Sequence, residues 1–419
     1  MVKFVHCADI HLGANPFEIE ERFEDMGKAF SQVCKFAIKE KVDFVLIAGD
    51  FFHNKTVNPR TLEQALEELE KLKKANIPVF LTEGNHDMSS YTHVYSWLQF
   101  LSSRKDIILL KTVKNDKLLN FWNGKEGAIY EHNKAYIIGL GYPGSTASKY
   151  IQKITDELKQ LIKDNKFINK PIICMLHSGI NRFVTESMGG LKEEEIEGLT
   201  NIINYLALGH IHVRYENVDK KYFNPGSVEC VRITDNPFNK GFYFVKLEEN
   251  KLETEFKLVK NRNSLSLSID IPNEEINIYD YILEIIKKEY EEKCEKNQKI
   301  MLQIKINGIA KSGTMEINIQ ELKKIIKNEI PVLYQDIMNL IIYVDEQEIK
   351  ISEDVSREEI DKIVVKEKIE KAGYKKDEID DIYNIITLLK ECAENGNITI
   401  DDNNGKDIEN MLLNISRGG

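Results

Sequence analysis

The segment Val2-Lys3-Phe4-Val5-His6-Cys7-Ala8-Asp9-Ile10-His11 joins a short apolar run to an aspartate and a histidine. A short apolar run bounded by polar residues is typical of a buried β-strand. Residues two apart on an extended segment point the same way, so Asp9 and His11 can converge on one ligand. The segment therefore predicts a strand whose carboxyl end bears two metal ligands.

Four more apolar runs end in the same manner. They are Phe44 to Ala48, Pro78 to Thr82, Ile172 to Leu176 and Tyr205 to Leu208. The residues that follow them are Gly49-Asp50, Gly84-Asn85-His86-Asp87, His177 and Gly209-His210-Ile211-His212. Open α/β sheets bind ligands at the carboxyl ends of their strands, because loops converge there. We therefore predict one metal-binding edge of a layered α/β domain, formed by Asp9, His11, Asp50, Asn85, His177, His210 and His212.

These residues supply carboxylate and amide oxygens and imidazole nitrogens, a mixture that suits Mn²⁺, Mg²⁺ or Fe better than a structural zinc. Two divalent ions about 3.5–4 Å apart need a shared ligand, and Asp50 is our candidate for that bridge. Asp87 stands beside His86, and the pairing could hold the imidazole ready to protonate a leaving oxygen. Such a site indicates an enzyme that acts on a phosphate ester.

Each motif alone has a simpler interpretation. Asp9 and His11 could form a turn, Gly49-Asp50 could begin an ordinary loop, and His177 could merely end a strand. The occurrence of all five motifs in order favours the metal site. His53 could contact the substrate phosphate or cap a loop, and we expect His6 and His93 to have structural roles.

The chain has 419 residues, more than the roughly 250–300 at which single cores stop growing, so two or three domains are expected. No apolar stretch approaches the ~20 residues that span a bilayer, and we see no signal-peptide pattern, so we expect a cytoplasmic, nucleoid-associated protein. Six scattered cysteines without a closely spaced pair argue against a zinc ribbon and a disulfide framework. The net charge of −11 is concentrated in residues 351–419, which carry −7, and it neither supports nor excludes DNA binding.

The sequence pattern changes along the chain. Residues 1–262 alternate strand patterns with helical ones at Phe23 to Glu40, Pro59 to Lys74 and Ser148 to Leu161. A polar stretch from Asn261 to Asn273 predicts a domain edge. We expect a small α+β domain over 274–350, and a helical segment with a mobile tail over 355–419 that contains two charged amphipathic helices.

The five motifs resemble those of the calcineurin-like metallophosphoesterase superfamily, and within it those of the SbcD-type DNA repair exonucleases. The narrower resemblance is carried by the stretches His6 to Gly13, Ile47 to His53, Ile77 to Asp87 and Asn224-Pro225-Gly226-Ser227-Val228-Glu229. It implies a β-sandwich flanked by helices, with a smaller α+β capping domain and a C-terminal helical pair. Protein Ser/Thr phosphatases of the same superfamily carry GDxxDRG and GNHE, which this chain does not match.

The resemblance also implies roles for individual residues. One metal would be held by Asp9, His11, Asp50 and His212, and the other by Asp50, Asn85, His177 and His210. His86 would be the catalytic histidine and His53 would touch the substrate phosphate.

The function implied by the resemblance is that of a Mn²⁺-dependent nuclease in DNA double-strand-break repair. Such an enzyme acts as a 3′–5′ exonuclease on duplex ends and as an endonuclease on single strands and hairpins. It would form a homodimer and pair with an SbcC-type, SMC-like coiled-coil ATPase, which would bind the helices at 355–395. Two other interpretations stay open: a phosphodiesterase for small nucleotides on the same site, and a non-catalytic DNA-bridging subunit.

Overall fold

The computed structural model describes residues 1–89, 95–113, 117–180, 190–232, 235, 239–248, 251–272, 276–295, 297–311 and 316–344, and scattered positions between 362 and 387. The chain divides into two compact units, one of residues 1–308 with 317–341 and one of residues 309–316 with 342–419. The predicted helices over 355–395 fall largely outside the described residues, as does His93.

The first sheet has six strands in the order β12-β11-β1-β2-β3-β4. Their bounds are β1 (Val2–Cys7), β2 (Phe44–Ile47), β3 (Val79–Leu81), β4 (Ile108–Leu109), β11 (Gly241–Glu248) and β12 (Lys251–Leu258). Strands β1 to β4 run parallel, whereas β11 is antiparallel to both β1 and β12. The carboxyl ends of β1, β2 and β3 therefore lie at the same edge of the sheet, as the motifs predict.

The second sheet also has six strands, in the order β5-β6-β7-β8-β10-β9. Their bounds are β5 (Ile129–Glu131), β6 (Tyr136–Gly139), β7 (Ile172–Leu176), β8 (Tyr205–Leu208), β9 (Tyr215–Asn217) and β10 (Tyr222–Asn224). Strands β6, β7, β8 and β10 run parallel, and the edge strands β5 and β9 are antiparallel to their neighbours. The ligand-bearing strands β7 and β8 are thus central neighbours in this sheet.

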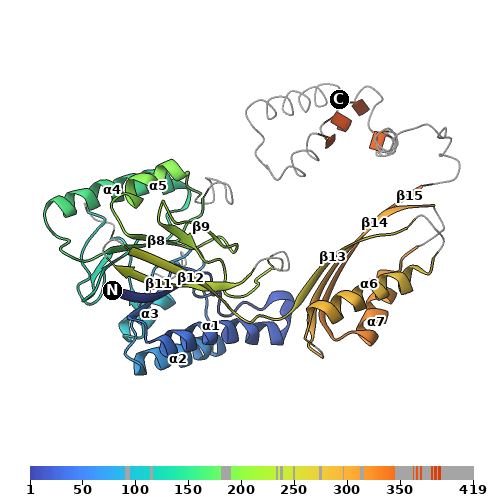
Figure 1. The fold of residues 1–419 in the computed structure, drawn as a ribbon, viewed down its shortest axis with the longest axis horizontal. Helices are drawn as coiled ribbons and strands as arrows, with labels where there is room; N and C mark the ends of the chain where they lie inside the picture. The colour runs from blue at the N-terminus through green and yellow to red at the C-terminus, as the bar shows by residue number, and fades with distance from the viewer. Residues whose placement is uncertain are drawn as a thin grey trace. The chain divides into compact units, whose positions relative to one another are not determined.

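The two sheets pack face to face and helices cover their outer faces. Alternate residues of a strand point to opposite faces, so Phe4 and Phe44 enter the core between the sheets while Val5 and Val45 enter the core under the helices. Figure 1 shows α1 (Glu20–Glu40) and α2 (Pro59–Lys74) on one side of the sheets, and α4 (Ala147–Lys163) and α5 (Glu193–Thr200) on the opposite side. The predicted β-sandwich flanked by helices is confirmed.

Helix α2 begins where the sequence predicts, whereas α1 begins three residues before the predicted Phe23 and α4 one residue before Ser148. Pro59 occupies the first turn of α2, where a missing N–H costs nothing, and the side chain of Asn58 accepts a hydrogen bond from the Thr61 N–H as its cap. Helix α3 (Trp97–Ser103) starts with a capping box between Ser96 and Gln99. Short 3-10 turns, η1 (Pro16–Glu18) and η2 (Gly144–Thr146), precede α1 and α4. Among the described residues, no helix is both long and apolar enough to cross a membrane.

A third sheet has the order β13-β14-β15, with bounds β13 (Ser264–Asp270), β14 (Ile300–Lys311) and β15 (Val332–Val344). Strands β13 and β14 run parallel, and helices α6 (Ile278–Lys293) and α7 (Ile319–Glu329) accompany the sheet (Figure 1). The α+β composition matches our expectation. The polar stretch that we assigned to a domain edge instead contributes β13, because its Ser and Leu residues alternate with strand periodicity.

Candidate metal centre

The seven predicted ligands come together from the ends of both large sheets. Three groups of side chains among the described residues have their ligand atoms within 4.8 Å of one another. Asp9, His11 and His212 form the first half-site, Asp50, His177 and His210 form the second half-site, and His11, His53 and His86 form a third group beside them. The structure therefore brings together residues that are up to 203 positions apart in the sequence.

The first half-site is formed by residues that follow β1 and β8. The Nε2 atoms of His11 and His212 face each other at 3.0 Å. Both carboxylate oxygens of Asp9, at 3.0 and 2.9 Å, accept the backbone N–H of His210, which ties the end of β1 to the end of β8. Asp9 and His11 are almost completely buried.

The second half-site adds the side-chain oxygen of Asn85. This Oδ1 atom lies 3.1 Å from His177 Nε2 and 3.0 Å from His210 Nδ1. The Oδ2 atom of Asp50 lies 3.3 Å from His177 Nε2 and 3.7 Å from His11 Nε2. Asp50 is thus the carboxylate that reaches both half-sites, which is the position that we predicted for it.

The donors of the second half-site fit a divalent cation. Nδ1 of His177 lies 2.7 Å from the Ala48 carbonyl oxygen, so this nitrogen carries a hydrogen and the lone pair of the neutral ring is on Nε2. Nε2 faces oxygens of Asp50 and Asn85, an arrangement that is favourable only when positive charge, either a bound cation or a proton on Nε2, lies between them. Nitrogen and oxygen donors around one point suit Mn²⁺, Mg²⁺ or Fe. The residues present therefore fit a metal ion.

The pKa shifts of His177 and Asp50 also favour positive charge in the site. Burial alone would lower the pKa of His177, but the neighbouring carboxylates, chiefly Asp50, outweigh this effect and raise the pKa to about 9. Burial works against the ionised form of Asp50, yet the surrounding imidazoles, chiefly His177, lower the pKa of its carboxyl group. The site thus stabilises positive charge beside Asp50, which a bound cation would supply.

Several ligands have an unusual backbone conformation. The φ angles of Asp9, His11 and Asp50 are each +50°, and that of His210 is +83°. Non-glycine residues adopt such left-handed angles infrequently, and they do so where surrounding structure compensates for the strain. Here the hydrogen bonds from Asp9 N to the Gly49 carbonyl (3.1 Å) and from His11 N to the Asp50 carbonyl (3.0 Å) lock the two strand-end loops together.

Glycines allow the ligand loops to approach closely. A Cβ atom on Gly49 would lie 2.2 Å from the His177 ring, and one on Gly84 would lie 2.1 Å from Asp50 Oδ1. Glycine allows both a tight turn and a close approach of the backbone. Gly49, with φ of +89°, serves both, whereas Gly84 has no such angle and is required by close packing alone.

The ring of His86 is held by the backbone of His53 and not by Asp87, its neighbour in the sequence. Nδ1 of His86 lies 2.6 Å from the backbone carbonyl of His53 and must donate to it, because a carbonyl oxygen only accepts. The two rings stack with centroids 5.3 Å apart, and the ring of His11 lies 4.9 Å from that of His86. His53 therefore supports His86 through its backbone.

The role that we expected for Asp87 is wrong. Its carboxylate accepts three backbone hydrogen bonds, from the N–H groups of Phe51 (3.1 Å), Phe52 (2.9 Å) and Gly84 (3.1 Å). Asp87 thus joins the loop after β3 to the loop after β2, and the His53 carbonyl takes the position that we assigned to it. His6 is structural as expected, buried between the hydroxyl of Tyr205 and the carbonyl of Leu208.

Asp235 is a residue of the site that the sequence did not reveal. Its Oδ2 atom lies 3.1 Å from His212 Nδ1 and also accepts the backbone N–H groups of Val231 and Arg232, each at 3.1 Å. Burial opposes ionisation, but the bond to His212 and nearby positive charge lower the pKa of Asp235 to about 2. Asp235 is therefore an ionised partner, at neutral pH, of His212, which we predicted as a metal ligand.

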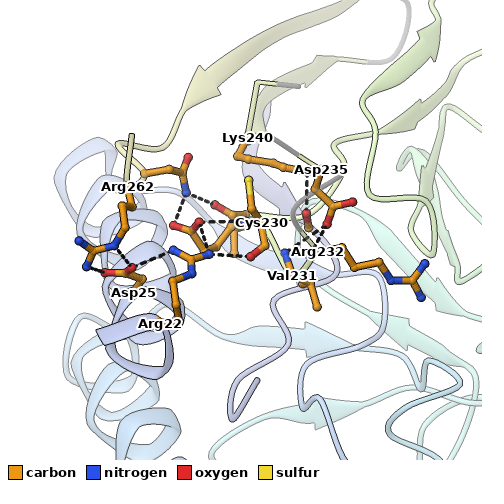
Figure 2. A network of polar contacts seen from close by, with 12 residues as sticks. Arg22, Asp25, Cys230, Val231, Arg232, Asp235, Lys240 and Arg262 are labelled. Atoms are coloured by element: carbon orange, nitrogen blue, oxygen red, sulfur yellow. Dashed lines mark hydrogen bonds and ion pairs between the residues drawn. The ribbon is translucent and has the colours of Figure 1, made fainter. Parts of the chain in front are cut away.

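A second buried polar cluster adjoins this loop, and we call it the Arg22 cluster (Arg22, Asp25, Glu229 and Arg262). Arg22 bonds to Asp25 (2.8 Å), Glu229 (2.9 Å) and the Cys230 carbonyl (2.7 Å), and Arg262 forms a two-pronged pair with Asp25 at 2.6 and 2.9 Å. Figure 2 shows these contacts next to those of Asp235. The loop that carries Asp235 is thus anchored to α1.

This chain is similar to a known protein family and to several known proteins. Residues 2–214 match the family model of the calcineurin-like phosphoesterases. The DNA double-strand break repair protein Mre11 of Methanococcus maripaludis is 27% identical over 290 residues, which cover 64% of this chain and 73% of the relative. Mre11 of Archaeoglobus fulgidus is 30% identical over 292 residues, which cover 64% of this chain but only 62% of the relative. The crystal structure of the calcineurin-like phosphoesterase YfkN from Bacillus subtilis shares 15% identity and a TM-score of 0.37, and covers 62% of this chain and 93% of that one.

Proposed function

This chain belongs to the calcineurin-like phosphoesterase family, and from this premise we propose that it is a metal-dependent DNA nuclease of double-strand-break repair. The observation that carries the proposal is the pair of half-sites that share Asp50. A single shared carboxylate between two sets of nitrogen and oxygen donors is what two neighbouring divalent ions require.

The proposed ligands follow the half-sites. Asp9, His11, Asp50 and His212 would hold one ion, and Asp50, Asn85, His177 and His210 the other, with Mn²⁺ as the proposed metal. Divalent ions at such a site neutralise the charge of a phosphate diester and activate water for its hydrolysis.

The chain's own residues would place and move protons. Since Nδ1 of His86 donates to the His53 carbonyl, Nε2 is the ring atom that we assign to proton exchange with the leaving oxygen of the ester. The backbone N–H of His86 donates to Asp50 Oδ1 at 3.0 Å, so the residue that handles the proton is held on the shared carboxylate. We assign the ring of His53, half-buried beside His86, to the substrate phosphate.

DNA is the proposed substrate because the relatives carry the name of DNA double-strand break repair proteins. We propose 3′–5′ exonuclease activity on duplex ends and endonuclease activity on single strands and hairpins. The third sheet with α6 and α7 would form the capping domain that selects DNA, and the C-terminal segment 355–419 would bind an SbcC-type ATPase in a homodimeric assembly.

The test is digestion of a duplex oligonucleotide labelled at one end, with Mn²⁺ or with EDTA. We expect nucleotides to be released with Mn²⁺ only, and a parallel assay on a p-nitrophenyl phosphodiester shows whether the metal site is active. Hydrolysis of the small diester without any action on duplex, single-stranded or hairpin DNA would replace the nuclease by a small-molecule phosphodiesterase. Inactivity on both substrates in a protein that retains its metal would favour a DNA-bridging subunit.

A further inference from the structure

The two half-sites orient their histidines by different means. In the second half-site, Nδ1 of His177 is held by a backbone carbonyl, that of Ala48. In the first half-site, Nδ1 of His212 is held by a side chain, that of Asp235, at 3.1 Å. A side-chain carboxylate can be replaced by mutation whereas a backbone carbonyl cannot, so the first half-site offers a direct experiment on how a ligand ring is oriented.

The contact with Asp235 fixes the tautomer of His212. The Oδ2 atom of Asp235 is an acceptor, since it takes the N–H groups of Val231 and Arg232, so the hydrogen of the neutral His212 ring lies on Nδ1 and the lone pair lies on Nε2. Nε2 is the atom that faces His11 Nε2 at 3.0 Å, inside the first half-site. The ring is thus prepared to donate its lone pair to a cation at this point.

The position of Asp235 is itself fixed. Its Oδ2 atom accepts the N–H groups of Val231 and Arg232, and the preceding part of the loop is bonded to Arg22 through Glu229 and the Cys230 carbonyl (Figure 2). The backbone of His212 is held independently, because Nζ of Lys240 donates to its carbonyl at 2.9 Å. Ring and backbone of this ligand are therefore constrained from separate directions.

We propose that Asp235 is a positioning residue of the metal centre, which sets the affinity of the first half-site for a divalent cation and leaves that of the second half-site unchanged. The inference rests on the proposed two-metal site. Partners that orient a ligand histidine typically contribute about 10–100-fold to metal affinity.

The experiment is a calorimetric Mn²⁺ titration of the metal-free full chain, with bound manganese counted by elemental analysis. The wild type should bind two ions. Asp235→Ala should weaken one of the two binding steps by about 10–100-fold and leave the other unchanged. Asp235→Asn keeps an oxygen for the two backbone N–H groups and for His212 but removes the charge, so it should weaken the same step by about tenfold or less.

Asp43→Asn is the matched control. Asp43 is half-buried, whereas Asp235 is buried, and it also accepts a backbone N–H, that of Lys3 at 2.8 Å, but it precedes β2 and lies at the opposite end of that strand from Asp50. A merely structural role of Asp235 would lower the unfolding temperature of the metal-free protein, as in Asp43→Asn, without selective loss of one ion.

Two outcomes would overturn the inference while the nuclease proposal stands: unchanged binding of both ions in Asp235→Ala, or equal weakening of both. If Asp235→Ala does not fold, Asp235→Asn decides in the same way. A wild-type protein that binds no Mn²⁺, Mg²⁺ or Fe²⁺ would overturn both this inference and the proposed function.

Discussion

The metal centre and the Arg22 cluster are both buried and polar, yet their charges are arranged differently. In the Arg22 cluster two guanidinium groups, of Arg22 and Arg262, face two carboxylates, of Asp25 and Glu229, so the charges balance, although Arg22 Nε has no hydrogen-bond partner among the described residues. In the metal centre, atoms that can bind a metal ion face one another, as His177 Nε2 and Asn85 Oδ1 do. The Arg22 cluster matches two positive groups with two negative ones, whereas the metal centre gathers groups that a cation can bind. Charge balance thus separates a structural polar cluster from a binding site.

The strongest test of this contrast is Asp50→Ala, which removes the carboxylate common to both half-sites. Because each ion contributes several kcal/mol to phosphate-ester cleavage, we expect nuclease activity to fall by on the order of 10⁴-fold or more. Elemental analysis should show that manganese is lost as well. A variant that retains both ions and its activity would remove Asp50 from the shared position.

The corresponding change in the balanced cluster is Arg22→Met. Arg22 is 2% exposed, and its loss leaves the Glu229 carboxylate buried and unpaired, so the free energy of unfolding should fall by about 3–5 kcal/mol. Urea denaturation of the metal-free protein measures this loss. Arg60→Met is the control, because Arg60 also contacts two carboxylates but is 57% exposed, and exposed ion pairs contribute little to stability. Equal effects of the two substitutions would contradict the structural role of the Arg22 cluster.

His86→Ser separates metal binding from proton transfer inside the centre. Neither proposed ligand set includes His86, although its ring forms a third close group with His11 and His53, so manganese content should be unchanged. Nuclease activity should fall by about 100-fold or more, as is typical when a general acid is removed. The measurement pairs elemental analysis with single-turnover digestion of DNA, and loss of metal from this variant would make His86 a ligand.

The smallest expected effect is the gain in the free energy of unfolding when Mn²⁺ is added. This gain should depend on the metal centre and not on exposed ion pairs such as those of Arg60. At a free concentration 100 times the dissociation constant, each occupied half-site adds about 2.7 kcal/mol to the free energy of unfolding. Urea denaturation with and without Mn²⁺ should show this increment in the wild type and in Arg60→Met. Its persistence in Asp50→Ala would show that the ion binds elsewhere.

Most of the centre could be predicted because each ligand ends a strand and is marked by its local sequence. The family membership inferred from these motifs is confirmed, and the ligands lie together as expected. The assignment of Asp87 failed because adjacency in sequence says nothing about the direction of a side chain, which here points to backbone N–H groups of the loop after β2.

Asp235 and the Arg22 cluster could not be predicted because their contacts are long-range. The pairs Arg22 with Glu229 and Arg262 with Asp25 span 207 and 237 residues, and no local pattern marks such partners. Strand β13, by contrast, could have been predicted from its sequence. Polar and apolar residues alternate in Ser264-Leu265-Ser266-Leu267-Ser268-Ile269, as is typical of a strand. Its serines led us to interpret a strand as a boundary.

The contacts of Asn261 and Arg262 determine where this protein can be shortened. Both residues follow β12, the last strand of the first sheet along the chain. The strand bounds alone would suggest ending a shortened protein directly after Leu258. Such a cut would remove the partners of Glu229 and Asp25, since Asn261 donates to Glu229 at 2.7 Å and Arg262 to Asp25. A shortened catalytic fragment should therefore extend past Arg262. A fragment that limited proteolysis cuts before Arg262 should unfold more readily than one that retains this residue.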